Sequence, residues 1–175
     1  MFREKQAGSG FQWRDLGNIE DGRPNLGPTT LVAVYRLMQY TMRSVLISEY
    51  DPQTASRILI KAGELAGSEF CKSVLDTNLE FNEFVSDLQK KLRNMNIGIL
   101  KIEKADLEKM EFVLTVDEDL DCSGLPFLDE TVCDYDEGFI AGVLDTYTGR
   151  KFDVKEIDCW ASGGRTCRFS VKLKG

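Results

Sequence analysis

The sequence contains no histidine. Histidine is the side chain that most often acts as a general base, and it is the usual proximal ligand of haem. Its absence excludes Ser-His-Asp and Cys-His catalysis. It also removes the commonest protein ligand of metal ions.

Long hydrophobic runs are missing as well. No stretch approaches the roughly 20 uninterrupted apolar residues that a membrane helix needs. Residues 1–5 lead into glycine and polar residues, without the apolar core of a signal peptide. We therefore expect a cytoplasmic protein that has no membrane partner.

Positive charge is in deficit, because 22 Lys and Arg residues face 29 Asp and Glu residues and the net charge is −7. Such a chain repels phosphate backbones unless a local basic patch overrides the average. The strongest candidate patch, Lys90, Lys91 and Arg93, alternates with leucines at helical spacing and is expected to be a solvated helix face. We predict no nucleic-acid partner.

The length of 175 residues and the 42% hydrophobic share fit one globular domain. Glycines spread through residues 1–27 predict an extended N-terminal arm, followed by a single α+β domain over residues 28–175. Hydrophobic periodicity predicts helices at about 30–47, 51–70, 78–93 and 134–147. A period of two predicts two hairpins, with strands at about 97–102, 110–116, 152–159 and 166–173. The predicted fold is an antiparallel sheet covered by helices on one side.

Two glycines, Gly63 and Gly67, lie one turn apart on one face of the second predicted helix. Each costs about 1 kcal/mol of helix propensity relative to alanine, so something should gain from close approach there. The pattern favours a packed helix over a bound ligand.

Five cysteines are an odd number, and in a reducing compartment a cysteine cluster indicates a metal site or buried thiols rather than disulfides. Cys133 precedes a helix, while Cys159 and Cys167 face each other across a hairpin turn, with Glu156 three residues before Cys159. These four could hold zinc in a closed, structural site. Buried free thiols and a labile disulfide remain alternatives. Cys71 and Cys122 fit no ligand spacing and are expected outside the shell.

The same segment resembles the 4-vinyl reductase domain family. The resemblance rests on residues 133–139 (CDYDEGF), Gly142, residues 154–159 (VKEIDC), Gly163-Gly164 and residues 167–171 (CRFSV). Its ligand residues recur at steps of 23, 3 and 8. The phenol-sensing regulators of the family hold zinc with this set, so the resemblance implies zinc at Cys133, Glu156, Cys159 and Cys167.

The resemblance further implies a fold shared with haem-based nitric-oxide sensors and a vesicle-tethering subunit, with helices at a dimer interface and an apolar pocket. Residues 23–27 and the helices after them are similar to stand-alone, hydrocarbon-binding members of the family. Two departures limit the analogy. The chain lacks the histidine of the haem-binding relatives, and only Phe112 stands near the tryptophan that, with a histidine, orients phenol in the sensors. Neither haem nor phenol is expected.

Aromatic and aliphatic residues are the candidates for lining the pocket, namely Phe70, Phe81, Phe84, Phe112 and Leu114. The alternative for each is simple core packing. The expected ligand is neutral and mostly apolar, and the helix at 30–47 is expected to contribute to a homodimer. We expect a zinc-stapled protein that binds or senses a small molecule. An enzyme or accessory factor of tetrapyrrole vinyl reduction, or an assembly protein without a ligand, are the alternatives.

Overall fold

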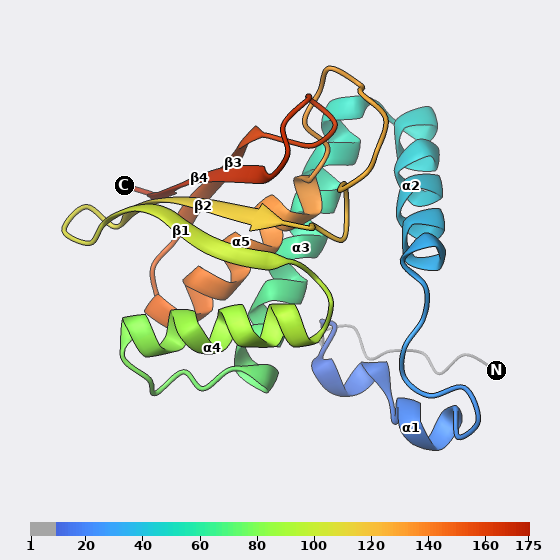
Figure 1. Cartoon of the computed structure of the whole chain (residues 1–175), viewed down its shortest axis with the longest axis horizontal. Helices are drawn as coiled ribbons and strands as arrows, with labels where there is room; N and C mark the ends of the chain where they lie inside the picture. The colour runs from blue at the N-terminus through green and yellow to red at the C-terminus, as the bar shows by residue number, and fades with distance from the viewer. Residues whose placement is uncertain (1–9) are drawn as a thin grey trace.

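The computed structural model describes residues 10–175, which form a four-stranded sheet with helices packed against one face (Figure 1). The main helices and strands follow the predicted order, and their ends lie within a few residues of the predicted ends. The elements are a 3-10 helix (Trp13–Leu16), α1 (Ile19–Gly22), α2 (Val32–Glu49), α3 (Pro52–Val74), α4 (Phe81–Asn94), β1 (Ile99–Asp106), β2 (Glu111–Asp117), α5 (Asp134–Thr148), β3 (Phe152–Asp158) and β4 (Cys167–Leu173). The predicted α+β class and antiparallel sheet are confirmed.

The sheet has the order β1-β2-β4-β3, and every neighbouring pair is antiparallel. Both predicted hairpins are present, and β2 and β4 join them at the centre. Buried and less buried residues alternate along β2, β3 and β4, so one face of the sheet is covered and the other faces outward. Phe152, Phe169 and Val171 are completely buried on the covered face.

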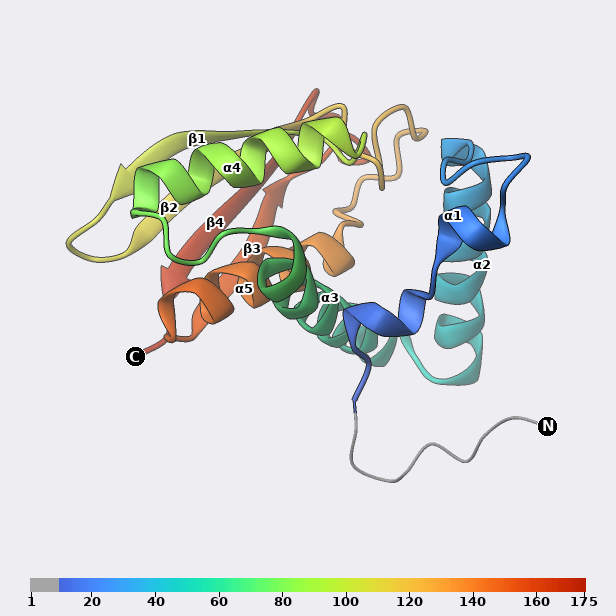
Figure 2. The same ribbon diagram turned by 90° about the horizontal axis from the view of Figure 1, so that it is seen from below.

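Two helices cover this face side by side. Helix α4 contacts β1 and helix α5 contacts β3, while α3 lies behind α5 as seen from the sheet (Figure 2). Helix α4 has a narrow apolar stripe in which Phe84, Leu88 and Leu92 are buried. The space between α4, α5 and the sheet is therefore enclosed by apolar side chains.

Helices α3 and α5 cross at glycines from both partners. A Cβ atom added to Gly63 or Gly67 would collide with the backbone of α5, and one added to Gly138 or Gly142 would collide with the backbone of α3. The two backbones are thus in direct contact, which only glycine permits. Close approach at Gly63 and Gly67 serves helix packing, as the sequence pattern favoured.

Helix α2 stands at the side of the domain with its polarity reversed. The face turned to the domain carries polar residues such as Tyr35, Gln39 and Arg43, whereas Leu37 and Met38 on the outer face are 67% and 63% exposed. None of its residues is fully buried. Within residues 10–175 no helix, α2 included, combines the length and apolarity that a membrane crossing needs.

The segment before α2 is not uniformly extended as the glycine content predicted. Residues 1–9 of the predicted arm lie outside the described residues. Between residues 10 and 27, local side-chain contacts stabilise two short helices, for example the Asn18 side chain that accepts a hydrogen bond from the backbone N–H of Asp21. Trp13 fixes the segment by packing its ring edge-on against Phe70, with 6.1 Å between ring centroids.

Candidate functional site

Four cysteines meet at the end of the sheet nearest the start of α5. Cys133 precedes the first turn of α5, Cys159 follows β3, Cys167 begins β4, and Cys122 lies in the loop after β2. All four are at most 1% exposed, and their sulfur atoms lie within 4.8 Å of one another. Cys133 Sγ is 3.8 Å from the sulfur atoms of both Cys159 and Cys167, and Cys122 Sγ is 2.9 Å from that of Cys167.

The spacing of three of these thiols matches a tetrahedral metal site. Bonds of about 2.3 Å from zinc to sulfur place two sulfur ligands about 3.8 Å apart. Both distances from Cys133 have this value, whereas the distance between Cys122 and Cys167 is too short for two ligands of one ion. Hydrogen bonds among the thiols, first of all those of Cys122, lower the pKa of Cys159 and raise the pKa of Cys133 and of Cys167. The cluster is compatible with a bound metal ion.

Glu156 lies beside this cluster rather than apart from it. Its Oε2 accepts a hydrogen bond from the backbone N–H of Cys133 at 3.0 Å, while its buried Oε1 has no partner among the described residues. Burial raises the pKa of Glu156 to about 8. The neighbouring carboxylate of Glu137 accepts from the backbone N–H of Glu156 at 2.9 Å and from Lys155 Nζ at 2.8 Å. These contacts hold α5 on β3.

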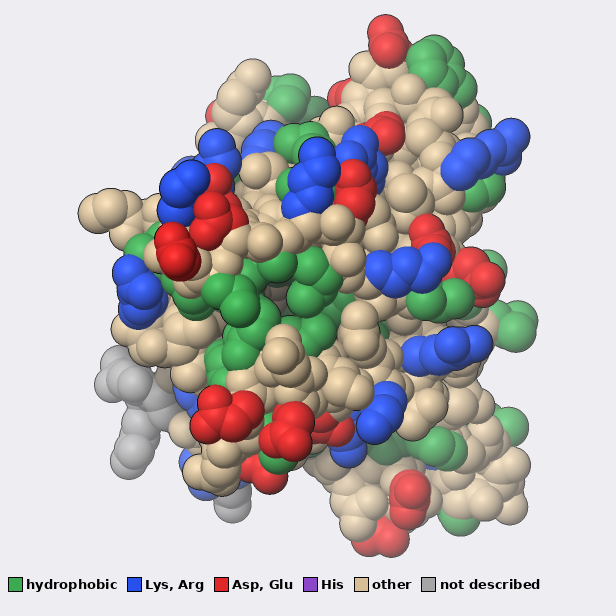
Figure 3. Space-filling model, turned by 60° about the vertical axis from the view of Figure 1, so that its left-hand side comes forward, with side chains coloured by type: hydrophobic (Ala, Val, Ile, Leu, Met, Phe, Trp, Pro, Cys, Tyr) green, Lys and Arg blue, Asp and Glu red, His purple; other side chains and the backbone are tan. Residues whose placement is uncertain are grey.

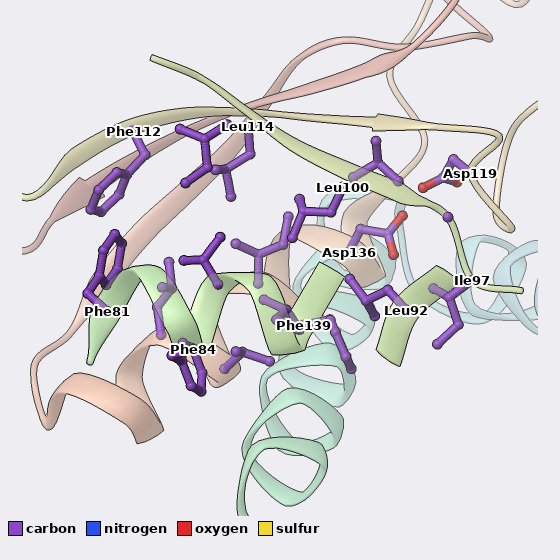
Figure 4. A pocket seen from close by; sticks show the side chains of 18 residues that line it. Phe81, Phe84, Leu92, Ile97, Leu100, Phe112, Leu114, Asp119, Asp136 and Phe139 are labelled. Atoms are coloured by element: carbon purple, nitrogen blue, oxygen red, sulfur yellow. The ribbon is translucent and has the colours of Figure 1, made fainter. Parts of the chain in front are cut away.

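An apolar cavity of about 60 Å³ lies between α4, α5 and the sheet. On the face that carries the β1–β2 turn and the start of α4, hydrophobic side chains gather around a hollow (Figure 3). Eighteen residues line the cavity, and most of them are aliphatic or aromatic (Figure 4). They are Phe81, Phe84, Val85, Leu88, Leu92, Ile97, Gly98, Leu100, Ile102, Phe112, Leu114, Val116, Asp119, Asp136, Phe139, Ile140, Val143 and Leu144.

The two carboxyl groups of this lining lie together at one end of the cavity. Asp119 and Asp136 face each other there, while Phe81 and Phe112 stack at the other end with 5.6 Å between ring centroids (Figure 4). Oxygen atoms of both carboxyl groups lie within 4.8 Å of each other and of Cys133 Sγ. Burial raises the pKa of Asp119 to about 7 and holds the pKa of Asp136 well above its usual value.

The loop that carries Asp119 also holds α2. Arg36 donates from Nε to the backbone carbonyl of Leu120 at 2.7 Å. The next carboxylate, Asp121, accepts from the Tyr35 hydroxyl at 2.8 Å and from Gln39 Nε2 at 2.5 Å. Residues 119–122 therefore connect the carboxyl end of the cavity, the thiol cluster and α2.

Residues 112–173, which include all four clustered cysteines and both cavity carboxyl groups, match the sequence model of the vinyl-4-reductase domain. This segment is a vinyl-4-reductase domain. Two uncharacterized proteins of Methanocaldococcus jannaschii, MJ0150 and MJ0745, are 27% identical over 108 residues and 31% identical over 106 residues. The alignments cover 62% and 58% of this chain and 61% and 56% of the relatives. The chain thus spans less than two thirds of the length of these curated relatives.

Solved structures share the fold of the vinyl-4-reductase domain and of the helices around it. A vinyl-4-reductase family protein from Methanocaldococcus jannaschii superposes with a TM-score of 0.61 at 18% identity, covering 96% of this chain and all of that one. The phenol-responsive sensory domain of the transcription activator PoxR gives 0.62 at 13% identity, covering 84% and 76%. Subunit 3 of a trafficking protein particle complex from Naegleria fowleri gives 0.65 at 15% identity, covering 82% and 95%.

The structure gathers most of the residues that the sequence singled out. Cys133, Cys159 and Cys167 meet in the vinyl-4-reductase domain beside Glu156, and Cys71 lies apart in α3. Phe81, Phe84, Phe112 and Leu114 line the cavity. Phe70 is not among the lining residues, because α3 lies behind α5 and its ring packs between those of Trp13 and Phe139.

Sequence reasoning missed three residues of the site. Cys122 was expected to lie away from the other thiols, but the loop after β2 brings it into the cluster. Asp119 in that loop and Asp136 in the first turn of α5 were not considered as pocket residues. A signal was present for Asp136, because a residue three positions after Cys133 on a helix lies on the same face.

Proposed function

We propose that this protein binds a small, neutral and mostly apolar molecule in the cavity between α4, α5 and the sheet, and acts as a binding or sensing module. The cavity itself carries the proposal, because it is lined almost entirely by apolar side chains and has a few polar groups at one end. Phe81, Phe84, Phe112 and Leu114 are the proposed contact residues. The reduced thiols of the cluster suit a cytoplasmic location.

The structural neighbours support this function through the fold. The PoxR sensory domain was crystallised with phenol, and the trafficking-complex subunit is covalently bound to palmitic acid. Both ligands are small and largely apolar, although they differ in shape. The shared fold therefore accommodates apolar ligands of more than one kind.

A thermal-shift screen with apolar aromatics, lipids and tetrapyrroles tests the binding function. A ligand that binds only the folded state adds roughly 2.7 kcal/mol at 100 times its dissociation constant, so melting should shift visibly. Leu114→Phe should abolish the shift by filling the cavity. The matched variant Val113→Phe changes the adjacent residue, whose side chain points to the other face of β2, and should keep it. No shift with any compound would contradict the proposal and favour an assembly protein.

A structural zinc ion held by Cys133, Glu156, Cys159 and Cys167 is the second part of the proposal. Its support is the 3.8 Å spacing of the thiols and the unpartnered Oε1 of Glu156, which a metal ion would satisfy. Four protein ligands leave no position for a catalytic water, so the ion would join β3 and β4 to the start of α5. Cys122 then acts as a thiol that donates a hydrogen bond to the Cys167 thiolate.

Metal analysis of single variants separates the two candidates for the fourth ligand. The unaltered protein should contain one zinc ion per chain, and Cys122→Ser should retain it because serine still donates to Cys167. Glu156→Gln should bind zinc more weakly, as loss of a ligand predicts. The control is Cys71→Ser, which lies outside the cluster and should be unchanged. Loss of zinc in Cys122→Ser together with retention in Glu156→Gln would assign the fourth position to Cys122.

A homodimer through α2 is the third part of the proposal. The outer face of this helix exposes Leu37, Met38, Met42 and Val45, each by more than half of its surface. An apolar surface of this extent on a helix favours a partner of the same chemistry. The partner expected from symmetry is a second copy of the chain, with the two α2 faces in contact.

A further inference from the structure

We propose that the ligand of the cavity is a slender molecule whose head group donates hydrogen bonds to Asp119 and Asp136, and that anionic ligands are rejected. This inference rests on the proposed binding function and adds the chemistry of the ligand to it. It follows from the shape of the cavity, from its one polar end and from an acceptor that lacks a partner.

The shape of the cavity favours a chain over a ring system. The cavity runs beside α4 from Phe81 to Leu92, which at about 1.5 Å per residue is roughly 16 Å. A volume of about 60 Å³ over that length leaves a narrow slot rather than a wide chamber. An unbranched alkyl chain can follow such a slot, whereas a bulky ring would have to push α4 away from the sheet.

The polar end of the slot offers acceptors. Asp136 Oδ2 is buried and has no hydrogen-bond partner among the described residues. Asp119 is fixed by its own contacts, because its Oδ1 accepts from the backbone N–H groups of Asp121 at 2.8 Å and Cys122 at 3.1 Å. A buried acceptor without a partner is costly, and a hydroxyl or ammonium group of a ligand would satisfy it.

The same end disfavours an anion. Among the described residues that line the cavity there is no lysine or arginine. A carboxylate or phosphate head group would therefore bring its acceptor oxygens against two carboxyl groups with no cation to offset them. Entry of a fatty acid with its head at this end is disfavoured for the same reason.

A matched series of decyl compounds tests the inference on the unaltered protein. Decanol, decylamine, decanoate and decane share one chain and differ at the head, and displacement of an apolar fluorescent dye reports their affinities. We expect decanol or decylamine to bind at least about tenfold more tightly than decane, and decanoate most weakly, since one hydrogen bond to a charged group contributes about that factor. The comparison of decanol with decylamine shows whether the donor is neutral or charged.

Variants of Asp136 assign the effect to this end of the slot. Asp136→Leu removes the acceptor and should abolish the preference over decane, while decane itself remains bound. Asp136→Asn keeps a carbonyl acceptor and should retain decanol but weaken decylamine. Asp153→Asn, an exposed carboxyl on β3, is the control and should change nothing.

The outcomes separate this inference from the binding function. Equal affinity for all four compounds, or tightest binding of decanoate, would overturn the head-group inference and leave the binding function intact. Absence of binding by all four and by the dye would overturn both. A second metal ion per chain that is lost in Asp136→Leu would assign Asp119, Cys133 and Asp136 to a metal site and overturn the head-group inference.

Discussion

Replacement of Gly67 by alanine tests the helix crossing on which both sites depend. The added Cβ atom would collide with the carbonyl oxygen of Phe139, and its next nearest atoms are also backbone atoms of α5. A side chain could move aside, but a helix backbone can yield only by moving the whole of α5. The change therefore separates α3 and α5 along their crossing.

The expected loss of stability follows from two opposing terms. Overpacking in a close-packed region typically costs about 1–3 kcal/mol, and rigid backbone on both sides places this site at the upper end. The better helix propensity of alanine returns about 1 kcal/mol. We expect a net loss of about 2 kcal/mol or more in the free energy of unfolding, measured by urea denaturation followed by circular dichroism.

A matched variant isolates the crossing from helix propensity. Gly22 in α1 has open space where its Cβ would lie, so Gly22→Ala should leave stability nearly unchanged. Since α5 also carries Asp136 and follows Cys133, Gly67→Ala should reduce metal content and ligand affinity as well. If Gly67→Ala were as stable as the unaltered protein, or more stable, the direct backbone contact between α3 and α5 would be refuted.

Three further predictions concern the metal, the dimer and α2. Cys159→Ser should lower the melting temperature and the protection of β3 and β4 from hydrogen exchange, because metal-binding free energy is folding free energy; unchanged melting would argue against a structural ion. Leu37→Glu should give monomers by light scattering at micromolar concentration with unchanged circular dichroism, and a persistent dimer would exclude the outer face of α2 as the interface. Tyr35→Phe should cost about 2 kcal/mol through loss of the hydrogen bond to Asp121, whereas exposed Tyr50→Phe should cost nothing measurable; equal effects would show that this bond does not hold α2.

The order of the elements could be predicted because local signals agreed with the fold. Asp51 followed by Pro52 predicted the start of α3, and the Asp51 side chain accepts a hydrogen bond from the backbone N–H of Thr54 at 2.8 Å. Gly149 predicted the end of α5, and it has the left-handed φ of 69° that ends helices. The switch from a period of 3.6 to a period of two marked the start of the sheet. Short-range physical chemistry decides each of these features.

The missed features depend on contacts between distant segments. Cys122 joins the thiols through a loop whose path is set by hydrogen bonds to α2, and no spacing in the sequence encodes that path. The reversed polarity of α2 could not be recognised either, because an apolar stripe on a helix normally faces the core. Phe70 was a reasonable pocket candidate by composition, but the position of α3 behind α5 is a property of the whole fold.

Native mass spectrometry of the freshly purified protein tests the central claim most directly, because one spectrum reports metal, small molecule and subunit number together. The account predicts a dimer with one zinc ion per chain and a bound small molecule that the Leu114→Phe variant lacks. A metal-free chain that carries no small molecule, and that gains no adduct when decanol is added, would contradict it.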